Sequence, residues 1–268
     1  MNKKLIGTLA LTATLLSVDV NAAERRSMML KDGWLFAKDT VTQDTKWQNV
    51  KIPHDWAIYG PFDRNNDLQV VAVEQNGETE KTVKTGRTGG LPYYGKGYYQ
   101  TTIEIPDTAG RSFQLVFDGA MSNPVVRLNG KEVGHWAYGY NAFVLPLDGA
   151  VKPGTNLLEV DLYNKPQSSR WYPGAGIYRN VTLVETSKIH VPEWGTYITT
   201  PHVDKESATI HIATKIEGAG HNQKLDIKTD IINQDGKVFS MFKESRGAYR
   251  DRVEALLESV GLKEKLRE

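Results

Sequence analysis

The sequence predicts an all-β chain: a jelly-roll β-sandwich, then a partial immunoglobulin-like β-sandwich, then a short C-terminal helical tail. Three observations predict this fold class. Short runs of alternating apolar and polar residues recur as far as residue 187, with Gly, Pro and Asp between them. A second, smaller group of such runs reaches Phe239. From Ser240 a charged, amphipathic pattern replaces them.

Residues 1–23 are expected to be an export signal. Two lysines precede the apolar run LIGTLALTATLLSV, which is too short for an ordinary membrane span, and VNAA offers small residues for cleavage. A mature protein would then begin near Glu24 and be exported, to the periplasm or the cell surface. A buried N-terminal helix or a retained anchor is the alternative.

Residues 24–187 carry the strands of the predicted jelly-roll domain. In chain order these are GWLFAK, YYQTTIEI, FQLVF, VVRLNGKEV, NAFVLPL, NLLEVDLYN and GIYRNVTLV. Asn129 and Gly130 tolerate the positive φ angles of a tight turn, so VVRLNGKEV is expected to be a hairpin. The polar segment from Asp63 to Gly97 is long for a plain connection, and such loops are often functional or disordered.

Residues 188–239 are interpreted as the start of an immunoglobulin-like sandwich. ATIHIATKIE places Ile210, Ile212 and Ile216 on one face, and LDIKTDIINQDGKVF gives a further strand and a turn. Only three or four strands fit there, whereas such a sandwich needs about seven. Residues 240–268 are instead expected to be helical and of foreign character.

Composition excludes several classes of function. A net charge of +1 gives no electrostatic case for a nucleic-acid partner, and the absence of cysteine excludes disulfides and thiolate metal sites. The six histidines show no metal-binding spacing, and His54 is interpreted as structural. We expect no cofactor and no metal. The chain has 6 Trp and 12 Tyr, residues that serve cores and also stack on sugars.

Several motifs in order carry a resemblance to a known family. They are LKDGWLFAK, IPHDWAIYGPF, TGGLPYYGKGYYQTTIEIP, FDGAMSNPVVRLNGKEVGHWAYGYNAFVLPL, NLLEVDLYN and RWYPGAGIYRNVTLV. Together they resemble the N-terminal sugar-binding domain of family 2 glycoside hydrolases, in particular exported, β-galactosidase-like members. The following strands resemble the start of that family's immunoglobulin-like domain. Family members that act on different sugars share these domains, so the sugar stays open.

The resemblance implies a substrate-binding role for the turn that contains Arg170, Trp171 and Tyr172. In the family this turn reaches towards the active site. An arginine offers a rigid fork of donors to sugar hydroxyls, and a tryptophan offers a flat apolar face to a pyranose. Gly174 and Gly176 would let the backbone approach closely. The alternative is that the aromatic residues plug the end of the sandwich while Arg170 is solvated.

The resemblance also places the catalytic chemistry elsewhere. Family members use two glutamates on a (β/α)8 barrel, which needs about 250 residues. Only Ser240 to Glu268 follow the second group of strands, so we expect no catalytic residue in this chain. Asp55, Asp63, Asp118 and Glu132 are interpreted as turn and surface residues.

The tail RDRVEALLESVGLKEKLRE resembles the helical stretch that precedes the signature motif of ABC-transporter ATPases. No phosphate-binding loop accompanies it, so ATP binding is not supported. A frameshift, a fusion or a misassembled reading frame near Ser240 would explain this tail. Three hypotheses remain open: the non-catalytic portion of an exported glycosidase, a stand-alone carbohydrate-binding module, or a truncated product whose open sheet edge favours aggregation.

Overall fold

The structure is a computed structural model of the whole chain. It describes residues 25–60, 62–66, 68–71, 82–85, 92–165, 174–204, 207–221, 223–232, 238–247 and 253–261. Within these ranges the chain is almost entirely β, with antiparallel strand pairing throughout and one short helix, α1 (Trp56–Tyr59). This confirms the predicted all-β class and fits a β-sandwich. No helix in the described part of the chain is long and apolar enough to cross a bilayer.

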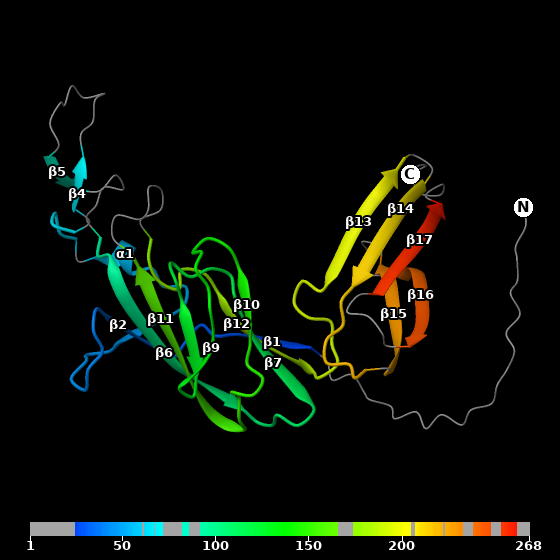
Figure 1. Cartoon of the computed structure of the whole chain (residues 1–268), viewed down its shortest axis with the longest axis horizontal. Coiled ribbons are helices and arrows are strands. Elements are labelled where there is room, and N and C mark those ends of the chain that lie inside the picture. Colours follow the sequence, from blue (N-terminus) through cyan, green and yellow to red (C-terminus); the bar gives the residue numbers. More distant parts are fainter. Residues whose placement is uncertain are drawn as a thin grey trace, which may run out of the picture.

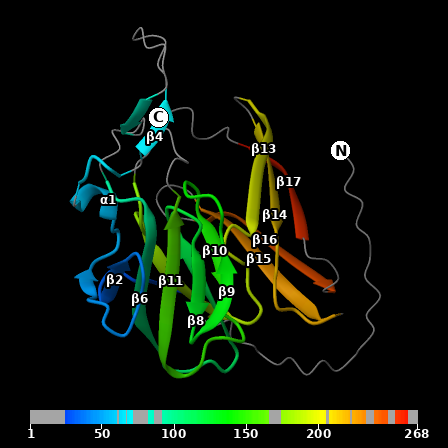
Figure 2. The same cartoon turned by 60° about the vertical axis from the view of Figure 1, so that its left-hand side comes forward.

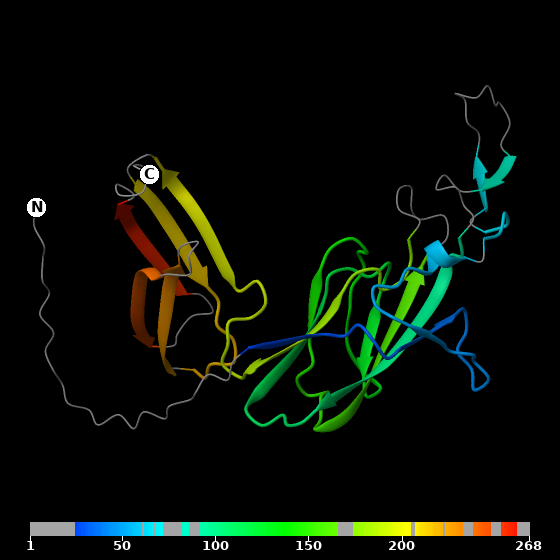
Figure 3. The ribbon, with the colours of Figure 1, turned by 180° about the vertical axis from the view of Figure 1, so that it is seen from behind.

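Two sheets form the N-terminal part of the molecule (Figures 1 and 3). The smaller has the strand order β1-β12-β7-β10 and the larger β3-β2-β6-β11-β8-β9. Their bounds are β1 (Arg26–Met29), β2 (Trp34–Lys38), β3 (Gln48–Val50), β6 (Gly95–Ile105), β7 (Arg111–Phe117), β8 (Val125–Leu128), β9 (Lys131–His135), β10 (Phe143–Pro146), β11 (Gly154–Asn164) and β12 (Val181–Ser187). Each expected strand run of this region contains or overlaps one of them.

The core lies between these two sheets, and strand alternation builds it. Along β11, Leu158, Val160 and Leu162 point inward while intervening residues face outward. Strand β7 differs, because it is buried on both faces from Ser112 onwards. Alternation within FQLVF predicts that Phe113, Leu115 and Phe117 share one face, and their burial confirms this. The inward side chains of both sheets form one apolar cluster, whose burial stabilises the sandwich.

The predicted hairpin is also confirmed. Strands β8 and β9 pair antiparallel, and the residues between them, Asn129 and Gly130, have φ angles of 53° and 78°. The Asn129 side chain donates to the Ala150 carbonyl and to the Asn156 side chain. The turn is therefore tied to the neighbouring loop as well as to its own strands.

Part of the long polar segment forms a small ribbon of its own. Strands β4 (Leu68–Val71) and β5 (Thr82–Thr85) pair antiparallel with each other. The residues 72–81 and 86–91 lie outside the described ranges. The prediction of a functional or disordered loop stays a prediction.

The C-terminal part contains a three-stranded sheet of order β13-β14-β17 and a two-stranded sheet, β15-β16 (Figure 2). The bounds are β13 (Thr196–Val203), β14 (Ser207–Thr214), β15 (Lys224–Ile232), β16 (Val238–Gly247) and β17 (Val253–Gly261). The expected strands in ATIHIATKIE and LDIKTDIINQDGKVF are present as β14 and β15–β16. Ile212 is buried, as the alternation of β14 predicts.

The predicted C-terminal helix is wrong for the residues that the structure describes. Strand β16 continues to Gly247, and β17 occupies part of the expected helix. In β17, Val253 opposes Thr214 and Gly261 opposes Ser207 on β14. The backbone groups of β14 gain a ladder on this side, and such tertiary pairing overrides local helix propensity.

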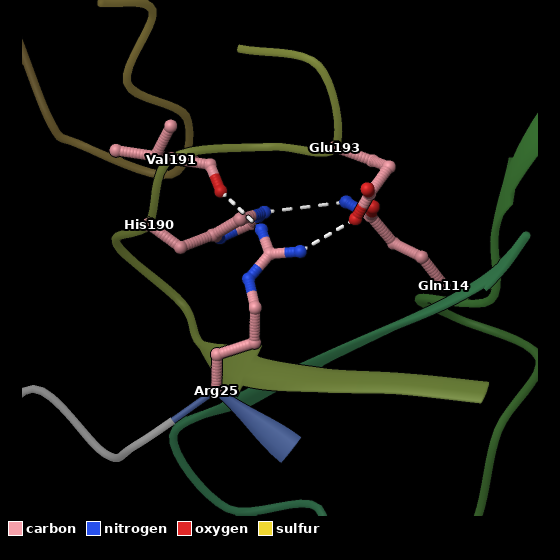
Figure 4. Close-up of polar contacts among 5 residues, drawn as sticks. All are labelled: Arg25, Gln114, His190, Val191 and Glu193. Carbon is pink, nitrogen blue, oxygen red and sulfur yellow. Dashed lines mark hydrogen bonds and ion pairs between the residues drawn. The ribbon is translucent and has the colours of Figure 1, made fainter. Parts of the chain in front are cut away.

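Side chains of the N-terminal sheets hold the connection between β12 and β13 (Figure 4). Arg25 donates from one guanidinium nitrogen to the Val191 carbonyl at 2.6 Å and from the other to the Glu193 carboxylate at 2.5 Å. Arg25 lies immediately before β1, which pairs with β12. The planar guanidinium group of one arginine therefore binds two residues of the connection.

His190 joins the same connection to both parts of the molecule. Its Nδ1 lies 3.0 Å from the Lys188 carbonyl, which can only accept, so Nδ1 carries the proton. Its Nε2 accepts from the side-chain amide of Gln114 on β7 at 3.2 Å (Figure 4). The backbone of His190 exchanges two hydrogen bonds with Glu217 in the C-terminal part. His190 thus contacts the N-terminal sheets by side chain and the C-terminal part by backbone.

Candidate functional site

The turn that the sequence singled out for substrate binding connects Asn164 to Gly174 at one end of the sandwich. We call this end the rim. Here β11 ends at Asn164, opposite the first residue of β6, Gly95. Arg170, Trp171 and Tyr172 lie outside the described residues, which resume at Gly174. The Asn164 side-chain amide donates to the Gly174 carbonyl at 3.1 Å. The two ends of the turn are therefore fastened to each other.

The segment that follows the turn is hydrogen-bonded to the IPHDW segment. The Asp55 carboxylate oxygen Oδ1 accepts from the backbone N–H groups of Ala57 and Ala175, each at 2.9 Å. The N–H of Trp56 donates back to the Ala175 carbonyl, also at 2.9 Å. Asp55 is therefore both the N-cap of α1 and the buried anchor of the turn.

Gly176 is the point of closest backbone approach at the rim. Its φ is 119°, and a Cβ there would lie 2.5 Å from the His54 carbonyl oxygen and 2.6 Å from the Tyr99 hydroxyl. It also exchanges two backbone hydrogen bonds with Met121. A residue without a side chain is required here, as the sequence suggested for close approach.

His54 sits in an aromatic setting beside this glycine. Its Nδ1 lies 2.7 Å from the Tyr99 hydroxyl, and its ring stacks on Tyr59 with centroids 5.7 Å apart. Burial lowers the pKa of His54 to about 4, which Asp55 opposes and Lys38 reinforces. The imidazole is therefore neutral at neutral pH. These contacts agree with the structural role that the sequence suggested for this residue.

The aromatic residues divide between core and surface. Trp56 is buried and stacks on Phe36 with centroids 5.4 Å apart, as expected of a core residue. The motif LPYYGKGYY does not itself show which of its four tyrosines are buried, and the structure shows that Tyr94 and Tyr99 are. The bulk of Trp136 predicts a core residue as well, but this prediction is wrong, since 37% of the residue is exposed.

Sequence reasoning missed the loop around Trp136 as part of the rim. Tyr138 and Tyr140 on this loop are exposed too. Burial raises the pKa of Tyr178, whose hydroxyl donates to the Gly139 carbonyl at 2.8 Å. The spacing of three aromatic residues within WAYGY was the available signal, but bulky rings are usually taken to be buried, and this loop was therefore not recognised.

The four carboxylates that the sequence singled out, all within the described residues, have structural partners of their own. Asp63 caps its own turn by accepting from Asn65, Asp118 accepts from the Asn180 side chain, and Glu132 lies near His135 on the exposed hairpin. Asp63, Asp118 and Glu132 therefore fit the turn and surface interpretation, whereas Asp55 is a buried N-cap that accepts two backbone hydrogen bonds. Within the described ranges, no group of three or more His, Asp or Glu side chains could hold a metal ion.

Comparisons with known proteins identify relatives of this chain. The β-galactosidase BoGH2A of Bacteroides ovatus is 34% identical over 199 residues, 72% of this chain and 21% of its own length. The β-glucuronidase of Bacteroides fragilis is 24% identical over 255 residues, 90% of this chain and 32% of its own. No protein-family model matches the chain.

A solved structure has the same fold over most of the chain. It is a glycosyl hydrolase family 2 member from Bacteroides cellulosilyticus, with a TM-score of 0.72 and 25% identity. The match covers 87% of this chain and 30% of that protein. This chain therefore spans about a fifth to a third of the relatives it matches. It is a homologue of the N-terminal portion of family 2 glycoside hydrolases.

Proposed function

We propose that this chain supplies the N-terminal, non-catalytic portion of an exported family 2 glycoside hydrolase with β-galactosidase-like specificity. Its role is to support and contact a β-linked glycoside during hydrolysis of the O-glycosyl bond. The sequence similarity to a β-galactosidase over 199 residues is the observation that carries the proposal. In the same proposal the N-terminal sheets form the family's jelly roll and β13–β17 form part of its immunoglobulin-like domain.

Substrate contact is proposed for the turn that bears Arg170, Trp171 and Tyr172. Support comes from how firmly the described residues hold its base. Asn164 and Gly174 are hydrogen-bonded across the turn. The backbone N–H of Ala175, the next residue, donates to the Asp55 carboxylate. Preorganised contacts lose less conformational entropy on binding, which favours sugar affinity. Arginine would donate to hydroxyls, and the aromatic rings would stack on the C–H face.

Bond cleavage is proposed to depend on residues outside this chain. A retaining glycosidase holds two carboxyl groups about 5–5.5 Å apart, one as acid/base and one as nucleophile. The rim carboxylate of Asp55 instead accepts two backbone hydrogen bonds in a buried position. In this proposal Asp55 has a structural role at the rim and takes no part in the reaction.

Export is proposed from the sequence of residues 1–23 alone. Expression in a bacterial host, fractionation and N-terminal sequencing of the recovered protein would test it. We expect a processed protein that begins near Glu24. An unprocessed protein in the cytoplasmic fraction would contradict export while leaving the relationship to glycosidases untouched.

Binding and hydrolysis assays on the purified chain test the central proposal. We expect calorimetry to detect weak binding of methyl β-galactoside, reduced by Arg170→Ala or Trp171→Ala. We expect no release of nitrophenol from nitrophenyl β-galactoside. Hydrolysis by the purified chain would contradict the assignment of catalysis to other residues.

A stand-alone carbohydrate-binding module is the second candidate. The exposure of Trp136, Tyr138 and Tyr140 favours it, because such rings commonly contact sugars. A module predicts that the isolated chain binds a glycan tightly by itself, whereas a glycosidase portion predicts weak binding that needs the rest of the site. The affinity of the isolated chain therefore separates the two.

A further inference from the structure

The loop between β9 and β10 presents three aromatic side chains to solvent. Trp136, Tyr138 and Tyr140 are 37%, 58% and 39% exposed, and together they form the aromatic platform. The loop passes from the six-stranded to the four-stranded sheet. Exposed apolar side chains that cluster on a protein surface often mark a binding site, whereas single scattered ones do not.

The first ring of the platform is fixed from behind. Trp136 stacks on Phe143 with centroids 5.6 Å apart and planes 13° apart. Phe143 in turn stacks on Phe117 of the core at 4.8 Å. The indole nitrogen of Trp136 donates to the Asn141 side chain at 2.8 Å. A ring held this way needs little ordering when a ligand covers it.

The rest of the loop is also pinned in place. A Cβ on Gly139 would lie 2.5 Å from the sulfur of Met121, so the loop backbone rests directly on that side chain. The Tyr178 hydroxyl donates to the Gly139 carbonyl from the other side. Tyr138 and Tyr140 flank this glycine, with ring centroids 5.4 Å apart.

Met121 connects the platform to the proposed sugar-contacting turn. It exchanges two backbone hydrogen bonds with Gly176, which follows the turn residues directly after Gly174 and Ala175. The platform and the re-entry of the turn therefore share one support. A ligand at the turn that extends along this end of the sandwich would meet the platform.

We propose that the aromatic platform stacks on the pyranose rings of a β-linked oligosaccharide, beyond the sugar at the turn. This rests on the proposed function, because the turn supplies the first contact. Aromatic faces match the apolar C–H faces of pyranoses, and tyrosine hydroxyls can bond to sugar hydroxyls. The loop WAYGYN has no charged and no long aliphatic side chain, which fits a neutral glycan better than a protein surface. The platform makes affinity grow with glycan length.

Calorimetry on the purified chain with a series of glycans tests this. The probes are methyl β-galactoside, β-1,4-galactobiose and β-1,4-galactotetraose. We expect affinity to rise along the series in the unmodified chain. Tyr138→Ala and Tyr140→Ala should each weaken tetraose binding about two- to tenfold, the range for one aromatic contact. Binding of the methyl glycoside should not change.

Tyr197→Ala is the matched control, since Tyr197 is 64% exposed on β13 in the C-terminal part. It should leave the whole series unchanged. Trp136→Ala removes a ring that also packs on Phe143, so circular dichroism must first show that this variant folds. If Trp136→Ala does not fold, the two tyrosine variants still decide the test.

The possible outcomes separate the two proposals. Unchanged tetraose binding in both tyrosine variants, with methyl glycoside binding still lost in Arg170→Ala, overturns the platform alone. Tyrosine variants that change only the sedimentation behaviour would show a protein interface and overturn it too. No binding of any probe by the unmodified chain would overturn glycan contact at the turn, and the platform with it.

Discussion

The Oδ1 atom of Asp55 accepts a hydrogen bond from the backbone N–H of Ala175 at 2.9 Å, although the two residues are 120 positions apart in the chain. The same atom caps helix α1 through Ala57. A single buried oxygen therefore joins the IPHDW segment to the base of the proposed sugar-contacting turn. The integrity of the rim should depend on it.

Replacing Asp55 by alanine should markedly lower the free energy of unfolding. Two buried backbone N–H groups lose their acceptor, so we expect about 2–4 kcal/mol less stability by urea unfolding. Asp55→Asn, which keeps an amide oxygen, should lose less. Asp63→Ala is the control, because Asp63 accepts from Asn65 at an exposed position. It should change stability by under about 1 kcal/mol, and equal losses at the two sites would contradict the role of Asp55.

Gly176→Ala should destabilise the chain through crowding more than through backbone conformation. A Cβ there would lie 2.5 Å from the His54 carbonyl oxygen. We expect a loss of about 3 kcal/mol or more, since close-packed surroundings add to the cost of a positive φ. Gly130→Ala shares a positive φ of 78° but has nothing within 4 Å of the added Cβ. Its loss should stay near 1 kcal/mol, and a similar loss at both would argue against crowding at Gly176.

His54 should make stability depend on pH. Burial lowers its pKa to about 4 in the folded chain, whereas the unfolded value is about 6.5. Between these values the unfolded chain binds more protons, so stability should fall as pH drops from about 6.5 towards 4. Because the ring is partly solvated, we expect His54 to lower the free energy of unfolding by only on the order of 1–2 kcal/mol over this pH range.

Unfolding free energies measured between pH 4.5 and 7.5 would check this. Subtracting the profile of His54→Gln from that of the unmodified chain isolates the residue from other titrating groups. His135→Gln serves as control, because the His135 side chain is 75% exposed. If both substitutions leave the same pH profile as the unmodified chain, burial of His54 does not drive the dependence.

Arg25 should hold the connection between the two parts of the molecule rather than stabilise either part. Arg25→Ala removes the contacts to Val191 and Glu193. Because exposed ion pairs contribute little, we expect under about 1 kcal/mol of stability loss. The distribution of distances between spin labels at exposed positions of β9 and β14 should broaden. Lys51→Ala, which removes an exposed pair with Asp32, should leave that distribution unchanged.

Local patterns were sufficient for most strands. The alternation in NLLEVDLYN matches the buried face of β11 because a strand turns every second side chain to the core. FQLVF correctly predicts the core face of β7, although its other face is buried too. The Asn129–Gly130 hairpin followed from the φ angles those two residues tolerate. The motifs around these strands also sufficed to indicate the family, which the relatives confirm.

Local patterns failed at β17 and at Trp136. Residues 253–261 have helical spacing, yet they form β17 on the edge of β14. Trp136 has the bulk of a core residue, yet Phe143 fills the space behind it and leaves it partly exposed. For β17 the deciding contact is with β14, a strand about 45 residues earlier that no local window contains. For Trp136 the neighbour is close in sequence, but bulk alone does not show which face of the ring is covered.

The sequence by itself determined most strands of the two N-terminal sheets, where the hairpin turns, and to which family the chain is related. These depend on periodicity and on backbone preferences within a few residues. Only the tertiary structure decided that Asp55 anchors Ala175, that Gly176 rests against His54, and that three aromatic side chains of one loop are exposed. Such contacts form when folding brings remote segments within hydrogen-bonding or van der Waals distance, and that information lies in the packing of the two sheets.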